Sequence, residues 1–334
     1  MSARRIPATV VTGFLGAGKT TLIRNLIRNA RGRRIAIIVN EFGDMGFDGG
    51  LLSDCGDDDC RPDQIVELTN GCICCTVADE FLPTMEALLA REPPPDHIVI
   101  ETSGLALPQP LVQAFNWPSV RHRVTVDGVV TVVDAVAVAE GRFAPDAESA
   151  PDPARMHDDP VEELFEDQLR CADLVVVSKA DLLGADALAG IEAVIARDTR
   201  AGVSALRSSG DGLPAEILLG LSAAAEGDLK GRESHHELEG EEHDHDDFDS
   251  FVAMPPAFAS LDELRRCVGA ALQVKGVFRI KGHARVDGKA APVVVQAVGA
   301  RVEAYFSPFP AKDGLVVIGL RDLDREATIA RLAG

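Results

Sequence analysis

A complete phosphate-binding motif lies close to the N-terminus of the chain. The run Gly13-Phe-Leu-Gly16-Ala17-Gly18-Lys19-Thr20 fits G-x-x-x-x-G-K-[ST] at every position, between a strand-like and a helix-like segment. A chance glycine-rich turn is the alternative, and the complete match in this context disfavours it. Backbone N–H groups can surround a β-phosphate here, and the helix dipole favours its charge. We expect Lys19 to bridge the β- and γ-phosphates and the Thr20 hydroxyl to bind Mg²⁺. The predicted nucleotide contacts are Gly13, Gly16, Ala17, Gly18, Lys19, Thr20 and Thr21.

An acidic strand end and a glycine follow in an order that suits the same site. The apolar run that starts after Asp96 ends at Glu101, and Gly104 comes three residues later. We expect Glu101 to orient Mg²⁺ or its water, as a catalytic residue beside Lys19, and the Gly104 N–H to sense the γ-phosphate. Leu105 stands where a Ras-like GTPase carries a water-positioning glutamine. Organising the water and the transition-state charge is worth up to ~10⁵-fold, so we expect slow intrinsic hydrolysis.

A third segment predicts which base is bound. The strand-like run 174–177 leads into Ser178-Lys179-Ala-Asp181. A carboxylate at Asp181 can accept both the N1–H and the N2–H₂ of guanine, a pair that adenine does not offer, while the Lys179 stem covers the base. A solvated strand end is the alternative for these four residues alone. Together with the phosphate motif they favour GTP, and Ser178 in place of the usual Asn or Thr leaves the degree of selectivity open.

Three cysteines within four residues form a candidate site for a soft or borderline metal. Cys72 and Cys74 point the same way if the backbone is extended, and Cys75 needs only a turn to join them. Thiolates select zinc, cobalt or copper(I). Three of them leave a tetrahedral site one ligand short, which suits transfer of the metal. The alternative is three buried hydrophobic side chains, which so dense a cluster beside Gly71 disfavours.

Other potential ligands carry weaker signals. Glu41 and Asp44 follow a predicted strand and either contact Mg²⁺ or approach the thiolates, or belong to a solvated acidic loop; the two interpretations are equally supported. Cys55 and Cys60 flank three aspartates; a second weak metal site is one interpretation of this segment, and an exposed loop is the favoured one. Four histidines among carboxylates predict either weak, fast-exchanging metal binding or only a solubilising tail, namely His235, His236, His243 and His245.

The elements that must position these residues alternate between strand and helix over the first two thirds of the chain. Strands are predicted at 8–12, 35–40, 64–68, 97–101, 129–133, 174–178 and 203–206, and helices at 19–30, 79–90, 161–172 and 185–197. Several of these strands are continuous Val/Ile runs, as in a parallel sheet buried on both faces. The pattern predicts an α/β, doubly wound, mostly parallel sheet of the P-loop NTPase type.

The rest of the chain predicts a linker and a second, smaller domain. We assign 1–222 to a P-loop GTPase domain with a surface insertion at 145–160, 223–250 to an acidic, His-rich linker, and 251–334 to a C-terminal α+β domain. The second domain is expected to hold helices at 260–272 and 324–332 and strands at 276–281, 293–297, 301–306 and 315–319. Cys171 and Cys267 fall on predicted helix faces and are expected in the core.

Composition excludes several classes of function. The 334 residues include 33 Lys and Arg against 53 Asp and Glu, a formal net charge of −20. Such an excess of negative charge disfavours a nucleic-acid or anionic-membrane binder. The longest apolar run, 128–139, contains Asp134 and is too short to span a bilayer. Glycines and Lys19 interrupt the N-terminal apolar stretch, unlike a secretory signal. We therefore expect a cytoplasmic protein.

Taken together, these segments resemble the CobW family of P-loop GTPases, and the C-terminal part resembles that family's C-terminal domain. The resemblance rests on Gly13–Thr20, Asn40–Asp44, Asn70–Thr76, Glu101–Pro108 and Ser178–Asp181. It implies a GTP-dependent metallochaperone that uses GTP and Mg²⁺ and carries Co²⁺ or Zn²⁺. The His-rich acidic segment and the Ser-Lys-Ala-Asp form are similar to those of members that supply cobalt. This implies delivery to a cobaltochelatase subunit of aerobic cobalamin synthesis.

Residue chemistry alone leaves the metal open, because Zn²⁺ normally binds thiolates more tightly than Co²⁺. Three hypotheses remain at this point: a cobalt chaperone, a zinc chaperone on the same scaffold, and a P-loop small-molecule kinase with a structural metal. The guanine-reading Asp181 counts against the kinase.

Overall fold

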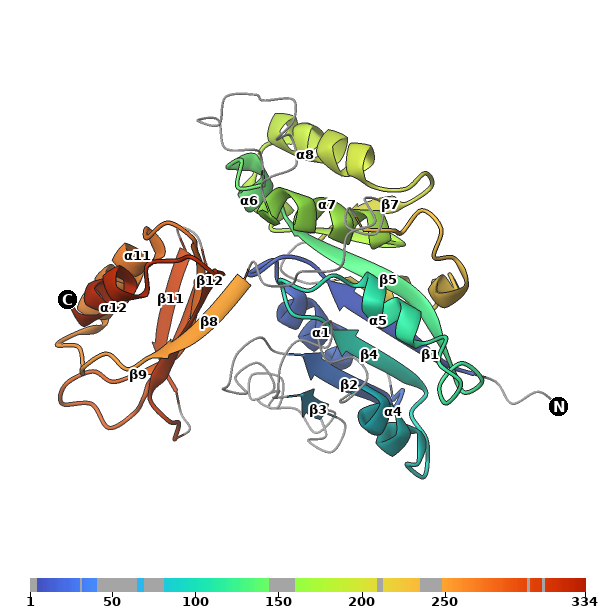
Figure 1. The fold of residues 1–334 in the computed structure, drawn as a ribbon, viewed down its shortest axis with the longest axis horizontal. Helices are drawn as coiled ribbons and strands as arrows, with labels where there is room; N and C mark the ends of the chain where they lie inside the picture. The colour runs from blue at the N-terminus through green and yellow to red at the C-terminus, as the bar shows by residue number, and fades with distance from the viewer. Residues whose placement is uncertain are drawn as a thin grey trace. The chain divides into compact units, whose positions relative to one another are not determined.

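The structure is a computed structural model that describes residues 5–30, 32–40, 65–68, 81–143, 160–208, 213–234, 248–298, 301–307 and 310–334. Contacts divide the chain into two compact units, the first containing the described residues up to 234 and the second those from 248 onward (Figure 1). No described helix is both long enough and apolar enough to cross a membrane. The predicted insertion lies outside the described residues, apart from its last residue, at which a helix begins.

The first unit is built on a seven-stranded sheet in the order β3-β2-β4-β1-β5-β6-β7. All of its pairings are parallel, as the Val/Ile-rich runs predict. The carboxyl ends of the strands therefore lie along one edge, with β1 in the middle. The strands are β1 (Ile6–Thr12), β2 (Ile35–Asn40), β3 (Ile65–Leu68), β4 (His97–Glu101), β5 (Val124–Asp134), β6 (Leu174–Ser178) and β7 (Ser204–Arg207).

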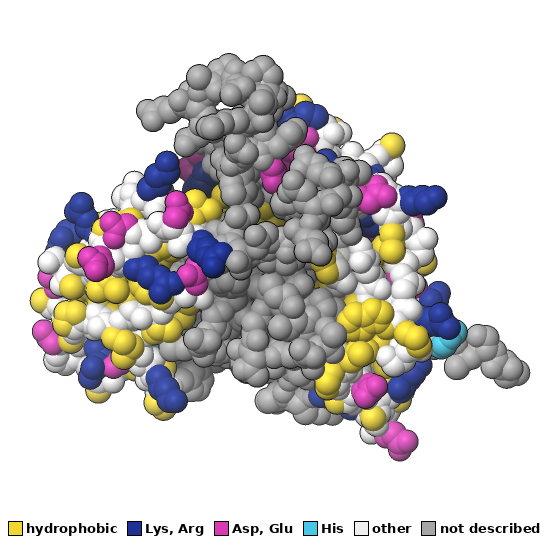
Figure 2. Space-filling model, in the orientation of Figure 1, with side chains coloured by type: hydrophobic (Ala, Val, Ile, Leu, Met, Phe, Trp, Pro, Cys, Tyr) yellow, Lys and Arg dark blue, Asp and Glu magenta, His cyan; other side chains and the backbone are white. Residues whose placement is uncertain are grey.

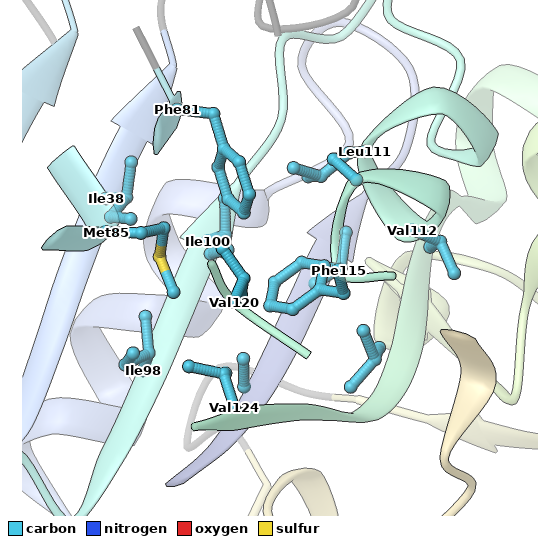
Figure 3. Close-up of a cluster of buried hydrophobic side chains, with 14 of the residues drawn as sticks. Ile38, Phe81, Met85, Ile98, Ile100, Leu111, Val112, Phe115, Val120 and Val124 are labelled. Atoms are coloured by element: carbon cyan, nitrogen blue, oxygen red, sulfur yellow. The ribbon is translucent and has the colours of Figure 1, made fainter. Parts of the chain in front are cut away.

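Helices cover both faces of this sheet, which explains why its central strands are apolar at successive positions. Val10 packs with α4 and α5 on one face, whereas Val11 packs with α1 and α9 on the other. Figure 3 shows the first of these clusters, where Phe81, Met85 and Phe115 meet the strands. The helices are α1 (Lys19–Arg28), α4 (Leu82–Leu89), α5 (Gln109–Ala114), α6 (Ala135–Ala139), α7 (Pro160–Cys171), α8 (Ala185–Asp198) and α9 (Ala215–Leu218), with 3₁₀ turns η3 (Ala180–Leu182) and η4 (Ala225–Gly227).

The second unit is a five-stranded antiparallel sheet in the order β11-β10-β9-β12-β8 with two helices, an α+β arrangement as expected. Ser260 caps the α11 helix, because its hydroxyl accepts from the Glu263 N–H at 3.1 Å. The Glu263 carboxylate accepts in turn from the N–H of Ala259, the residue before the cap, at 2.6 Å. Its elements are β8 (Phe248–Ala253), α11 (Leu261–Leu272), β9 (Val277–Ala284), β10 (Val293–Val298), β11 (Arg301–Phe306), β12 (Gly314–Leu320) and α12 (Arg325–Ala333).

The two cysteines expected in the core are confirmed there. Cys171 is 0% and Cys267 is 1% exposed, and burial raises the pKa of the Cys171 thiol to about 12. Such a thiol stays protonated and is a poor metal ligand. On the face shown in Figure 2, basic and acidic side chains are interspersed over the described surface of both units.

Both ends of the predicted linker differ from the expectation. Arg232 is 2% exposed and its guanidinium pairs with Asp173 at 2.6 Å, while the 6% exposed Glu226 pairs with Arg5 at 2.9 Å. Residues 225–234 are therefore packed on the first unit, and β8 begins inside the segment assigned to the linker. Acidic composition concealed these contacts, because it does not show which charges find buried partners.

Candidate functional site

The phosphate loop connects β1 to α1 and has the backbone that its glycines permit. Gly13 and Gly18 have φ values of 132° and 99°, in the region that favours glycine. At Gly13 a Cβ atom would also lie 2.1 Å from the carbonyl oxygen of Val132 on β5. The loop therefore runs directly against the neighbouring strand β5. Helix α1 begins at Lys19, immediately after Gly18, the last glycine of the loop.

Lys19 curls back over this loop. Its side chain is 6% exposed, and Nζ donates to the carbonyl oxygens of Gly13 at 2.6 Å and Phe14 at 3.2 Å. A buried ammonium group needs such partners. These bonds hold a positive charge at the mouth of the loop, where a phosphate oxygen could replace a carbonyl partner.

Thr20 and Glu101 meet beside the loop. The Thr20 hydroxyl donates to Oε1 of Glu101 at 2.9 Å, and Glu101 is 4% exposed. The parallel pairing of β1 with β4, which sets Val11 opposite Glu101, brings the carboxylate to the root of the phosphate loop. A hydroxyl and a carboxylate in contact are hard oxygen donors of the kind that Mg²⁺ binds.

The turn after β4, residues 102–108, packs against the phosphate loop. The Thr102 N–H donates to the carbonyl oxygen of Val11 at 2.9 Å, and the Thr102 hydroxyl donates to the Thr12 hydroxyl oxygen at 2.9 Å. Gly104 then lies so close to the phosphate loop that a Cβ atom would be 2.7 Å from the Leu15 backbone nitrogen. The structure thus brings Gly104, Lys19, Thr20 and Glu101 to one edge of the sheet.

The Ser-Lys-x-Asp segment is joined to the same loop. The Ser178 hydroxyl donates to the carbonyl of Ala17 at 2.6 Å, and Lys179 Nζ donates to that of Gly16 at 3.0 Å. Lys179 has a φ of 56°, an uncommon value for a non-glycine residue. Asp181 follows in η3 and is exposed. Ser178 therefore supports the phosphate loop, while the Asp181 side chain is exposed to solvent.

Sequence reasoning missed two residues that organise this edge. Asp134 ends β5, caps α6 by accepting from the Val136 N–H at 3.0 Å, and forms an ion pair with Lys179. An acid that closes a Val-rich strand was a readable signal. Gln168, on α7, donates to two carbonyls of the turn after β4, and nothing in its sequence surroundings marks it.

The predicted cargo ligands lie outside the described residues. Within the described ranges no three His, Cys, Asp or Glu side chains come together as a metal site. Thr21 is described and is exposed on α1. The predicted ligands that are not described are Glu41, Asp44, Cys72, Cys74, Cys75, His235, His236, His243 and His245, as well as Cys55 and Cys60.

Comparison with known proteins matches both units. Residues 7–205 match the nucleotide-binding domain CobW/HypB/UreG, and residues 248–334 match the Cobalamin synthesis protein cobW C-terminal domain. The chain is 53% identical to the zinc chaperone CobW of a Sinorhizobium species, over 98% of this chain and 96% of that protein. It is 48% identical to the zinc chaperone CobW of Pseudomonas aeruginosa, over 98% and 91%. The Zn(II)-bound YjiA GTPase from E. coli aligns over 99% of both chains at 23% identity with a TM-score of 0.45, too low a likeness to bear on function.

Proposed function

Because this chain belongs to the CobW family of P-loop GTPases, we propose that it hydrolyses GTP and carries Zn²⁺ to a client protein that accepts the metal. The observation that carries this proposal is the 53% identity, over 98% of the chain, to a relative named as a zinc chaperone. The nucleotide half is supported independently by the geometry of the phosphate loop and by its contacts with Glu101 and the Gly104 turn.

GTP would bind along the carboxyl edge of the sheet. Lys19 would exchange the carbonyl oxygens of Gly13 and Phe14 for β- and γ-phosphate oxygens. Asp181 accepts from the guanine ring. The Lys179 stem lies under the base, because its ammonium group is held at the far end by Gly16 and Asp134.

Thr20 and Glu101 would hold Mg²⁺, directly or through water. When bound, this ion neutralises charge that develops on the β- and γ-phosphate oxygens. The protein supplies the Thr20 hydroxyl and the Glu101 carboxylate, whose oxygens already lie 2.9 Å apart. Leu105, 7% exposed, offers no group that could orient the attacking water, so we expect slow turnover.

Cys72, Cys74 and Cys75 are proposed as the cargo ligands, since three thiolates suit Zn²⁺ and leave one position for transfer. Glu41 and Asp44 follow β2 and are proposed to link this site to the γ-phosphate. The histidines from His235 onward are proposed as weak accessory ligands.

Cobalt is the second candidate cargo. The match of residues 248–334 to a domain described as that of a cobalamin synthesis protein favours it. A cobaltochelatase subunit would then be the client. Competitive Co²⁺/Zn²⁺ titration with and without Mg-GTP separates the two cargoes.

The deciding experiment measures Zn²⁺ affinity with Mg-GTP, with Mg-GDP and without nucleotide. We expect the tightest binding with Mg-GTP, by about 5–150-fold, and an equal effect of Zn²⁺ on GTP affinity, because coupling between two sites is reciprocal. Cys74→Ala should abolish the coupling and leave Mg-GTP binding largely intact. Lys19→Ala should abolish hydrolysis and the nucleotide response while keeping the nucleotide-free Zn²⁺ affinity. Equal Zn²⁺ affinities in all three states would make the metal structural and overturn the chaperone proposal.

A further inference from the structure

A buried glutamine holds the turn after β4. Gln168 is 0% exposed, and its Nε2 donates to the carbonyl oxygens of Gly104 at 3.2 Å and Ala106 at 3.1 Å. The reverse orientation of the amide would set its oxygen against both carbonyls, so the contacts themselves define which end points to the turn. One side chain therefore spans the turn from helix α7.

Helix α7 is a firm support for this amide. The Thr131 hydroxyl of β5 donates to the Gln168 carbonyl at 2.8 Å, and Gln109 Nε2 of α5 donates to the Asp167 carbonyl at 3.0 Å. Carbonyls in the last turn of a helix lack partners within the helix, and here Arg200 and Arg232 supply further donors to them. The end of α7 is thus tied to the sheet and to its neighbours.

The turn has little internal support of its own. Its bonds are long, with the Ala106 N–H to the Ser103 carbonyl at 3.2 Å and the Leu105 N–H to the Ser103 hydroxyl at 3.4 Å. At the same time Gly104 is pressed against Leu15 of the phosphate loop. Thr102 fixes the start of the turn through its bonds to Val11 and Thr12, and Gln168 holds Gly104 and Ala106 beyond it.

Only the N–H half of the Gln168 amide takes part in holding the turn. This buried Oε1 has no hydrogen-bond partner within the described part of the chain. A methionine would fill a similar volume without a buried acceptor, since an unsatisfied one is unfavourable. What glutamine adds at this position is the pair of N–H donors to the turn.

We propose that Gln168 is a positioning residue for GTP hydrolysis, which fixes the Gly104 turn at the distance from the phosphate loop that the γ-phosphate requires. This inference rests on the proposed function. Gln168 acts through the turn and not on the nucleotide itself. GDP, which lacks the γ-phosphate, does not need the turn.

The test compares Gln168→Met with Gln109→Met. Gln109 is a matched control, because it is 3% exposed, donates one bond to a backbone carbonyl of α7 and also has an Oε1 without a partner among the described residues. Its bond does not reach the turn. We expect Q168M to lower the rate constant of GTP hydrolysis, measured under single-turnover conditions, about 10–100-fold. This is the loss in rate expected from a misplacement near 1 Å. KM for GTP should change less than kcat, and GDP affinity should stay at the wild-type value. Q109M removes one support of α7 but leaves both bonds from Gln168 to the turn in place, so it should lower kcat much less than Q168M does.

Affinity for a non-hydrolysable GTP analogue relative to GDP provides a second readout that needs no turnover. Q168M should lose preference for the analogue and Q109M should retain it. If Q168M does not fold, Gln168→Asn, which withdraws the same amide by one methylene, carries the same expectations. Wild-type kcat in Q168M, equal losses in the two glutamine variants, or parallel weakening of GTP and GDP would overturn the inference. A wild-type protein that turns over no GTP would instead refute the proposed function, while the affinity ratio still tests Gln168.

Discussion

The close approach of Gly104 to the phosphate loop leads to a sharp prediction for Gly104→Ala. The φ of Gly104 is outside the left-handed region, so the need for glycine here is one of space. An alanine Cβ would lie 2.7 Å from the Leu15 backbone nitrogen, whereas ordinary contact begins at 3.4 Å. The turn or the phosphate loop must therefore move by about 0.7 Å, the difference between these two distances, because neither atom belongs to a flexible side chain.

A shift of this size should affect catalysis more than stability. Misplacement by 1 Å costs about 10²-fold in rate, so we expect G104A to lower single-turnover GTP hydrolysis by about 10–100-fold. Overpacking should lower the free energy of unfolding by about 1–3 kcal/mol. Hydrolysis is followed by released phosphate, and stability by urea unfolding without nucleotide.

Gly190→Ala provides the matched control. Gly190 lies on the exposed side of α8, and its added Cβ would meet nothing within 4 Å. This variant should keep wild-type hydrolysis and gain about 1 kcal/mol, the difference in helix propensity between alanine and glycine. Wild-type kcat and wild-type stability in G104A would refute the contact between the turn and the phosphate loop.

Three further predictions test other parts of the chain. Asp181→Asn should reduce the preference for GTP over ATP and XTP, because an amide cannot accept both guanine donors; unchanged base selectivity would show that this segment does not read the base. Removing residues 235–247 should eliminate only weak, fast-exchanging metal binding. Loss of stoichiometric tight binding in a metal titration would show that the histidines of this segment, and not the cysteines, form the high-affinity site. Burial lowers the pKa of His97 from 6.5 to about 4, with its Nε2 2.8 Å from the Thr9 hydroxyl. The unfolded chain therefore binds more protons between these values, and stability should fall as the pH falls through this window, by about 2 kcal/mol from pH 7.5 to about 5. Urea unfolding should show this extra loss in the wild type and not in His97→Gln, and identical pH dependence of the two would contradict it.

Most of the fold could be predicted from apolar patterning. The runs at β2, β4, β6 and β11 match the predicted strands residue for residue, and α11 and α12 begin within one residue of the prediction. Four of the described helices and strands were missed. Helices α5, α6 and α9 have six, five and four residues, too short for a helical period to show, and β8 follows directly on acidic residues that suggest a linker.

The nucleotide site was predictable where its chemistry is local. Gly13, Lys19 and Thr20 lie within eight successive residues, in a loop shaped by its own glycines and in the first turn of the helix that follows it. Their grouping therefore needs no knowledge of distant residues. Gln168 and Asp134 could not be assigned in this way, because their roles exist only through contacts with other elements.

The sequence by itself determined the phosphate motif and the strand–helix alternation, and it supplied Asp181, the acid that we propose to read guanine, since each depends on residues within one turn or one strand. Only the tertiary structure decided that Thr20 meets Glu101 81 positions away, that Gln168 holds Gly104 64 positions away, and that Ser178 supports Ala17 161 positions away. These pairs form because the sheet places β1 between β4 and β5 with β6 beside β5. That order is a property of the packed sheet as a whole, which no local pattern of residues encodes.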